Sequence, residues 1–118
     1  MGQLSTHVLD TALGKPAAAM TITLYRTVEG QAAVELCRTV TNADGRTQEP
    51  LLQGPAFLAT AYELVFDVAP YFRKSGAQVS DPPFLDRVTL RFTVTDPSAK
   101  YHIPLLVSPW SYSTYRGS

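Results

Sequence analysis

Two histidines and one arginine are the side chains best suited to chemistry in this chain. His7 and His102 are its two histidines, and each lies in a run of alternating polar and apolar residues. An imidazole titrates at about pH 6.5, so two of them can supply a base and an acid near neutral pH. Arg46 follows an Asp-Gly turn, and its planar guanidinium can hold a urea-like, carbonyl-rich or anionic ring through two hydrogen bonds. The competing interpretations are satisfied strand histidines and a solvated turn arginine, and the pattern alone leaves both open.

A metal site and a serine nucleophile are the competing chemistries. Two histidines and the distant Cys37 fall short of a closed zinc site, and the chain has no Cys-x-x-Cys, His-x-His or His-Glu-x-x-His spacing. We therefore expect neither a metal nor a cofactor. A Gly-x-Ser-x-Gly motif is also missing, so spacing gives a nucleophilic serine no support. Cys37 itself is predicted to be a small buried side chain rather than a reactive thiol.

The composition is that of one globular domain. The chain has 118 residues, 45% of them hydrophobic, with no linker or internal repeat, so we expect one domain over residues 1–118. Ten Lys and Arg balance ten Asp and Glu, which argues against partners such as nucleic acid or an anionic membrane. No apolar run is long enough to span a bilayer and no secretion signal opens the chain, so a cytoplasmic location is expected.

Strands are the elements that must position these side chains. Residues 88–95 place Val88, Leu90 and Phe92 on one face and polar residues on the other, which is typical of a half-buried strand. The same alternation, separated by Gly, Pro and Asp turn signals, predicts strands at residues 4–10, 20–25, 34–37, 62–67, 101–107 and 111–115. Seven or eight short strands at this spacing indicate an all-β, two-sheet sandwich.

Two segments depart from simple alternation. Residues 67–75 predict the chain's one short helix, with Pro70 in the first turn and Gly76 at its end. The tail, residues 111–118, is rich in strand formers, whereas most termini carry expendable polar residues. This tail brings Arg116 close to the carboxylate of Ser118, although an ordered edge strand would explain it equally well.

Three motifs together resemble the transthyretin and 5-hydroxyisourate hydrolase family. LSTHVLD at residues 4–10, followed by GKPA, is similar to the family's opening signature, and TNADGR at residues 41–46 is similar to its internal turn. YHIPLLVSP at residues 101–109, ending in YSTYRGS, resembles its closing signature. The resemblance covers essentially the whole chain. Its most specific part is the terminal Tyr-Arg-Gly-Ser, which separates the hydrolases from the hormone-carrying transthyretins.

The resemblance implies a fold, an assembly and a set of site residues. The fold would be a transthyretin-like sandwich of about eight strands with one short helix, assembled as a homotetramer, a dimer of dimers, with two central clefts. Position by position, the catalytic residues would be His7, Arg46, His102 and Ser118. The substrate 5-hydroxyisourate would be bound by His7, Arg46, Tyr115 and Arg116. The family often has His-Tyr-His where this chain has Lys100-Tyr101-His102, so the role of position 100 is open.

The implied reaction is hydrolysis of a ring amide of 5-hydroxyisourate, in urate catabolism, to 2-oxo-4-hydroxy-4-carboxy-5-ureidoimidazoline. We hypothesise that His102 deprotonates the attacking water, while Arg46 holds the substrate and stabilises negative charge on the carbonyl oxygen. His7 would bind the ring or pass a proton to the leaving nitrogen, and the choice of base between the two histidines stays open. Proximity of a fixed arginine should lower the pKa of the base.

Two non-catalytic functions compete with the hydrolase. The first is a transthyretin-like protein that binds a small aromatic ligand, of the thyroid-hormone type, without turnover. The second is an immunoglobulin-like interaction module, which needs no special terminus. The histidine pair, Arg46 and the Tyr-Arg-Gly-Ser ending favour the hydrolase over both.

Overall fold

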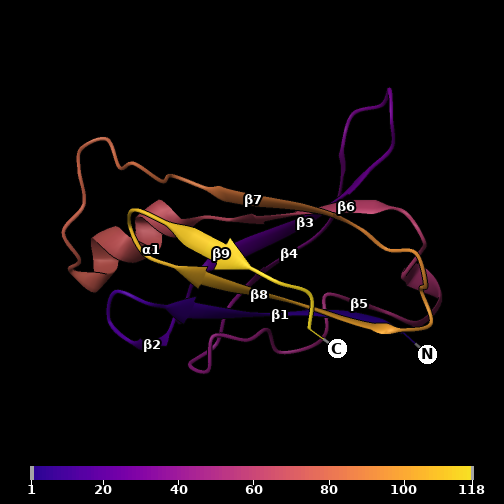
Figure 1. Ribbon diagram of the computed structural model, residues 1–118, viewed down its shortest axis with the longest axis horizontal. Helices are drawn as coiled ribbons and strands as arrows, with labels where there is room; N and C mark the ends of the chain where they lie inside the picture. The colour runs from indigo at the N-terminus through magenta and orange to yellow at the C-terminus, as the bar shows by residue number, and fades with distance from the viewer. Residues whose placement is uncertain (1, 118) are drawn as a thin grey trace.

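Two facing β-sheets make up most of the molecule (Figure 1). The computed structural model describes residues 2–117, and within them the chain forms nine strands, one α-helix and one 3₁₀-helix. Sheet A contains β1 (Gln3–Asp10), β2 (Lys15–Pro16), β5 (Leu52–Gln53), β8 (Lys100–Val107) and β9 (Tyr112–Thr114). Sheet B contains β3 (Thr21–Thr27), β4 (Val34–Val40), β6 (Ala61–Phe66) and β7 (Val88–Thr93). The connections include the 3₁₀-helix η1 (Gly54–Ala56) and α1 (Val68–Ser75). The expected two-sheet sandwich with one short helix is confirmed.

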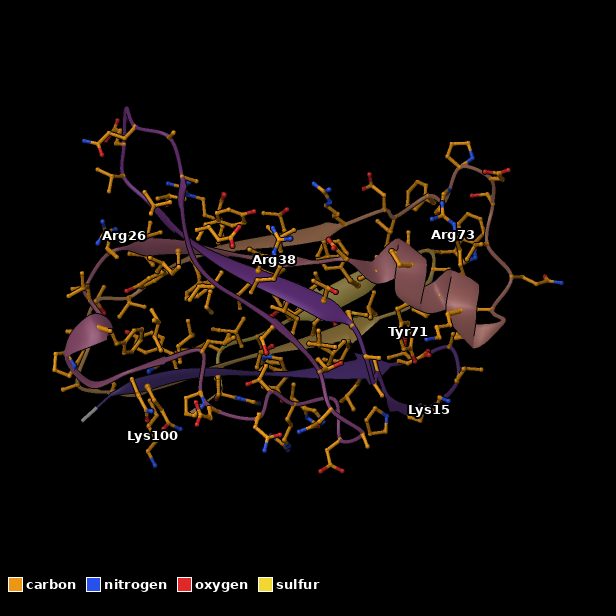
Figure 2. The ribbon with its side chains drawn as sticks, turned by 180° about the vertical axis from the view of Figure 1, so that it is seen from behind. Lys15, Arg26, Arg38, Tyr71, Arg73 and Lys100 are labelled. Atoms are coloured by element: carbon orange, nitrogen blue, oxygen red, sulfur yellow. The ribbon has the colours of Figure 1, made fainter. Side chains whose placement is uncertain are left out.

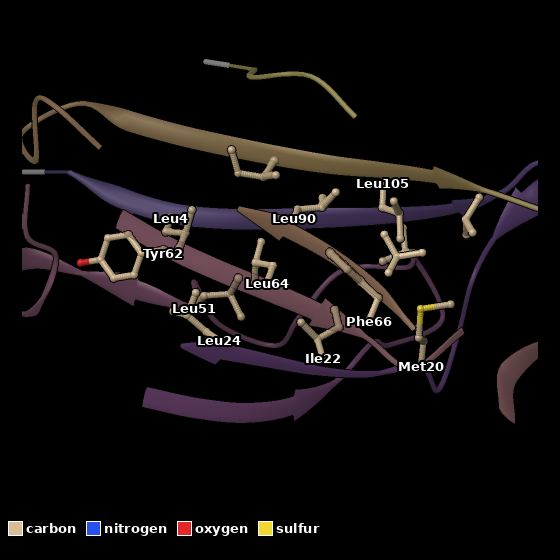
Figure 3. Packing of buried hydrophobic residues seen from close by; sticks show 14 of the residues in the cluster. Leu4, Met20, Ile22, Leu24, Leu51, Tyr62, Leu64, Phe66, Leu90 and Leu105 are labelled. Carbon is tan, nitrogen blue, oxygen red and sulfur yellow. The ribbon is translucent and has the colours of Figure 1, made fainter. Parts of the chain in front are cut away.

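The core lies between the sheets because alternate residues of each strand point inward. In β1 the even-numbered residues are buried, so Leu4 and Val8 face the core while the odd-numbered residues face away from it. Figure 3 shows Leu4 in the core with side chains of sheet B, among them Ile22, Leu64 and Phe66, which are fully buried. Burial of a side chain of this size contributes about 1.5–3 kcal/mol to stability. The inward face therefore stabilises the sheet, and the outward face is left for other roles.

Strand β8 lies between β1 and β9 and brings the two ends of the chain into one sheet. It pairs in parallel with β1 and antiparallel with β9. The parallel register sets Ser5 opposite His102, and His7 opposite Pro104. Residues almost a hundred positions apart in sequence are thus direct neighbours.

The helix α1 begins at Val68 and ends at Ser75, close to the predicted bounds. Pro70 lies in its first turn, and Gly76 follows with a φ of 83°, the left-handed conformation that glycine adopts without steric cost. Phe72 is buried against the core, and the hydroxyl of Tyr71 donates a hydrogen bond to the carboxylate of Asp10 (2.7 Å). This bond ties the helix to the end of β1. Among residues 2–117 no helix is long and apolar enough to cross a membrane.

Short strands and one sheet edge differ from the prediction. No strand was predicted at residues 15–16, yet Lys15 and Pro16 pair with Asp10 and Leu9 as strand β2. β5 was not expected at all. In β4, Val34 is exposed while Cys37 is half-buried, because Cys37 lies opposite the inward-facing Leu24. Burial raises the pKa of the Cys37 thiol, which disfavours the reactive thiolate.

Candidate active site

The outward face of sheet A collects the histidines predicted from the sequence. Ser5 and His7 lie on this face of β1, and His102 lies beside them on β8. All three side chains are half-buried. The core thus fixes the strands from one side while the imidazoles remain accessible from the other.

Arg46 joins this face through the turn formed by residues 42–46, here called the arginine turn. The amide oxygen of Asn42 accepts hydrogen bonds from the backbone N–H groups of Asp44 and Arg46 (2.9 and 3.2 Å), which closes the turn. The N–H of Val8 donates to the carbonyl of Gly45 (2.8 Å), and Arg46 forms an antiparallel bridge with His7. The guanidinium is exposed, so it extends from a turn that is held by backbone hydrogen bonds.

Glycine at position 45 permits this docking. Its φ is 76°, a conformation that other residues rarely adopt. A Cβ at this position would also overlap the carbonyl oxygen of Val8. The close approach of the arginine turn to β1 therefore requires a residue without a side chain.

The hydrogen bond of His7 determines where its proton lies. Its Nε2 is 2.9 Å from the carbonyl oxygen of Asp44, and because a carbonyl only accepts, Nε2 must carry the hydrogen. The arginine turn thus fixes both the orientation of this ring and its protonated nitrogen. In this arrangement Nε2 of His7 cannot accept a proton from water.

His102 presents the opposite arrangement. Its Nδ1 is 2.9 Å from the hydroxyl oxygen of Ser5, and Nε2 has no hydrogen-bond partner among residues 2–117. Desolvation lowers the pKa of His102 below 6.5, and the charges of Arg46 and His7 lower it further. The ring is therefore neutral at pH 7, and the arrangement leaves Nε2 available as a base when Nδ1 donates to Ser5.

The end of the chain runs along β8 beside His102. Gly117 exchanges two backbone hydrogen bonds with His102 (2.7 and 3.2 Å). The guanidinium of Arg116 stacks on the ring of Tyr101, 4.1 Å from its centroid, and donates to the carbonyl oxygen of Lys100 (3.3 Å). Arg116 thereby fastens the tail to the sheet, whereas the Tyr115 side chain is 61% exposed. Ser118 lies outside the described residues.

The structure thus brings three of the sequence-predicted residues to one region, together with two groups that the sequence analysis missed. His7, Arg46 and His102 lie on or beside the outward face of sheet A, whereas Arg116 stacks on the buried Tyr101. The missed groups are the hydroxyl of Ser5 and the carbonyl of Asp44. Alternation already places Ser5 on the face of His7, which was a usable signal. Within residues 2–117 no three His, Cys, Asp or Glu side chains come close enough to hold a metal ion.

Comparison with known proteins gives one consistent family. The model of the HIUase/Transthyretin family matches residues 4–117. The 5-hydroxyisourate hydrolase of Ralstonia nicotianae is 56% identical over 119 residues, covering all of both chains. Among solved structures, (S)-allantoin synthase superposes with a TM-score of 0.94 at 47% identity over 99% of this chain, which spans only 44% of that chain. Sea bream transthyretin in complex with thyroxine has a TM-score of 0.85 and 26% identity, with 98% of this chain and 94% of that chain covered.

Proposed function

The chain belongs to the HIUase/transthyretin family, and we propose that it hydrolyses 5-hydroxyisourate to 2-oxo-4-hydroxy-4-carboxy-5-ureidoimidazoline, a step of urate catabolism. Water adds to the carbonyl carbon of a ring amide, and the C–N bond breaks. The carbonyl becomes a carboxylate and the leaving nitrogen takes a proton. The reaction needs a base, a proton donor and a cation beside the oxygen that becomes negative.

His102 is proposed as the base. Its pKa is lowered by desolvation and by the neighbouring positive charges, so the imidazole is neutral when substrate arrives. Donation from Nδ1 to the hydroxyl of Ser5, across 2.9 Å, would leave the lone pair on Nε2 to take a proton from water. Ser5 is a positioning residue in this proposal, because it acts on the ring and not on the substrate.

Arg46 is proposed to stabilise the negative charge that develops on the carbonyl oxygen, and His7 is proposed to contact the substrate ring. The exposed guanidinium of Arg46 would bind carbonyl oxygens of the ring and stabilise the oxyanion. His7 already donates from Nε2 to the arginine turn, so the other edge of its ring would bind the substrate ring or pass a proton to the leaving nitrogen. The proton that His102 takes from water balances this transfer. Tyr115 and Arg116 are proposed to bind the rest of the substrate, and Ser118 is proposed as a fourth catalytic residue.

The contrast between the two imidazoles is the observation that carries this proposal. A protein that merely bound an aromatic ligand would not need a neutral imidazole with a free nitrogen beside a fixed arginine. The relatives named 5-hydroxyisourate hydrolase, with 56% identity in the Ralstonia case, point to the same activity.

The ultraviolet decay of freshly prepared 5-hydroxyisourate tests the activity directly. Wild-type protein should accelerate the decay, and His102→Ala or Arg46→Ala should each lower kcat by about 10²–10⁴. Arg38→Ala, which removes an exposed arginine on sheet B, is the matched control and should retain full activity. Equal acceleration by wild type and His102→Ala would favour a thyroid-hormone-type binder, which thyroxine binding measured by calorimetry would then identify.

A homotetramer, arranged as a dimer of dimers, is proposed as the working form. β9 is an edge strand whose three residues are all exposed, and exposed edges of this kind can pair with another copy. The site residues lie on an open sheet face, and a second copy across that face would shield the site from bulk solvent while leaving room for the attacking water.

The cytoplasm is proposed as the place of action. A cysteine-poor chain with the free thiol of Cys37 fits a reducing compartment. Cell fractionation would test this location. Detection of the chain in the cytosolic fraction would support it, and detection in the membrane or secreted fraction would contradict it.

A further inference from the structure

A cavity lies between α1 and the segment that follows β1. Figure 1 shows these two elements at the same end of the molecule. Its volume is about 460 Å³, within the range of pockets that hold small organic ligands. Its walls come from three places: the segment from Lys15 to Thr21, the helix α1, and Ala43 of the arginine turn. None of His7, His102 or Arg46 lines it, so it is separate from the site described above.

The lining combines an apolar floor with positive charge. Pro16, Ala18, Ala19 and Pro70 supply apolar surface, and Lys15 and Lys74 supply two ammonium groups. The one acidic residue in the lining, Asp67, forms an ion pair with Arg87 (3.5 Å). The net charge left facing the cavity is therefore positive. Figure 2 shows Lys15 and Tyr71 together at this end of the molecule.

The walls of the cavity are held in place before any ligand binds. Tyr71 lines the cavity while its hydroxyl is bonded to Asp10, a buried carboxylate that also accepts hydrogen bonds from two backbone N–H groups. On the opposite wall, Ala19 has a φ of 61°, a conformation costly for a residue with a side chain. Its N–H donates to the carbonyl of Thr41 (2.9 Å), next to the arginine turn. Pre-formed walls reduce the entropy cost of binding.

The arginine turn separates the two sites. Ala43 lines the cavity, while the next residue, Asp44, accepts the hydrogen bond from His7 and Arg46 bridges to the same histidine. The hydroxyl of Thr41, just before the turn, donates to the carbonyl of Ala17 (2.7 Å) and accepts from the N–H of Met20 (2.9 Å). A ligand in the cavity would therefore contact the same short segment that orients the proposed catalytic groups.

We propose that this cavity is an effector site for a small organic anion with a planar apolar body and one carboxylate, and that its occupancy raises the hydrolase rate through the arginine turn. The apolar body would lie on the proline and alanine floor, and the carboxylate would lie between Lys15 and Lys74. Added contacts to Ala43 would restrict the turn that holds Arg46 and His7. The rate effect rests on the proposed hydrolase function, whereas the binding does not.

Binding is tested with naphthalene-2-carboxylate as the probe and its neutral carboxamide as the matched ligand. Methyl NMR of alanine-labelled full-length protein localises the probe, because Ala18, Ala19 and Ala43 line the cavity and Ala61, on β6, does not. We expect the three lining methyls to shift and Ala61 to stay unchanged. The carboxamide should bind about tenfold more weakly, because it lacks the charge.

Variants on and off the cavity test the charge directly. The double variant Lys15→Gln/Lys74→Gln should weaken the carboxylate about tenfold. Arg73→Gln removes a cation from the same helix but outside the lining (Figure 2) and should leave affinity within about twofold. If the methyl signals of the lining alanines do not shift on addition of the carboxylate, the proposed binding site is wrong. This holds whether another copy covers the cavity or nothing binds there. Equal affinity for acid and amide, or for wild type and the double variant, overturns the ligand class.

The rate effect has its own readout. At saturating carboxylate, kcat/KM for 5-hydroxyisourate should rise about fivefold in wild type and stay constant in the double variant. Binding without a change in rate would remove the coupling through the arginine turn. If the protein shows no hydrolase activity, the proposed function is wrong. The alanine methyl shifts would still show whether the cavity binds the carboxylate.

Discussion

Two imidazoles on one sheet face are chemically different because their neighbours are different. His7 must donate its Nε2 hydrogen to a backbone carbonyl, whereas His102 has Nε2 without a partner among residues 2–117. Local hydrogen bonds therefore favour His102 over His7 as the base. The sequence left that choice open, because the motifs that contain Asp44 and Ser5 do not reveal which imidazole nitrogen each group contacts.

The lowered pKa of His102 predicts the acid side of the pH profile. A base works only when neutral, so activity should persist above the pKa of His102 and disappear as the pH falls through it, giving an acid limb of kcat/KM below pH 6.5. Arg46→Gln removes one of the charges that lower this pKa, so the limb should move to higher pH. Arg38→Gln should leave it in place. A limb that does not move with Arg46→Gln would assign the titration to another group.

Removal of the Ser5 hydroxyl should weaken catalysis without weakening binding. Loss of its hydrogen bond to His102 Nδ1 should lower kcat about tenfold with KM little changed. Ser5→Thr keeps a hydroxyl and should restore most of the rate, and Ser80→Ala, in an exposed loop, is the matched control. Imidazole ¹⁵N shifts of His102 should report a changed tautomer in Ser5→Ala. Unchanged ¹⁵N shifts would leave Ser5 with a packing role only.

Residues at the site differ in how far sequence could predict them. His7, Arg46 and His102 were found because their motifs resemble a known family, and the structure places them together. Ser5 was missed because its importance comes from the parallel register with β8. That register depends on the whole sheet, so it cannot be predicted from the sequence of either strand alone.

At the scale of elements, the arginine turn links β1 to the proposed chemistry. It is short, it is closed by the Asn42 side chain, and it docks on β1 through the carbonyl of Gly45. Its family motif predicted a turn at this position, but not its contact with His7. The contact follows from the docking and therefore needed the tertiary structure.

Gly45→Ala should damage both stability and activity. The added methyl meets the carbonyl oxygen of Val8 in a left-handed backbone conformation, so we expect a loss of about 1–3 kcal/mol in unfolding free energy and a large fall in kcat/KM as Arg46 moves. Gly30→Ala is the control, because Gly30 has a similar φ of 77° with open space around it. Denaturant unfolding and turnover should show Gly30→Ala slightly destabilised and fully active. Full activity in Gly45→Ala would contradict the role of the turn.

The strands that could be predicted are those in which apolar and polar residues alternate over many positions. β1, β6, β7 and β8 were predicted within one to two residues because alternation over six to eight residues fixes which face is buried. β2 and β5 have two residues each, too few for a period to be visible. In β4 the register shifts opposite Leu24 and Tyr25, so its apolar residues do not mark the inward face.

At the scale of the whole molecule, the proposed assembly would complete the active site. Trp110, Tyr112 and Tyr115 are exposed beside or on the edge strand β9, and the site face itself is open. Large exposed aromatic side chains are typical of surfaces that another subunit covers. The sequence could suggest this assembly only through the family resemblance.

Tyr112→Lys should separate the subunits and abolish activity together. A charge on β9, at a side chain that is 46% exposed in the single chain, would be desolvated if another copy covered it. Light scattering should give four times 12.9 kDa for wild type and a smaller mass for the variant. Leu58→Lys, at a residue 42% exposed and away from β9, should stay tetrameric and active. A wild-type monomer with full turnover would refute the assembly.

The parallel pairing of β1 with β8 also has a consequence for synthesis in the cell. The hydrogen bond between Ser5 and His102 closes a loop of 97 residues, and a parallel pair of this separation is slow to form. On the ribosome, β1 is translated first and must wait for β8 before its second edge is covered. Until then the nascent chain exposes an unpaired strand edge, which can pair with other chains and aggregate or be bound by chaperones.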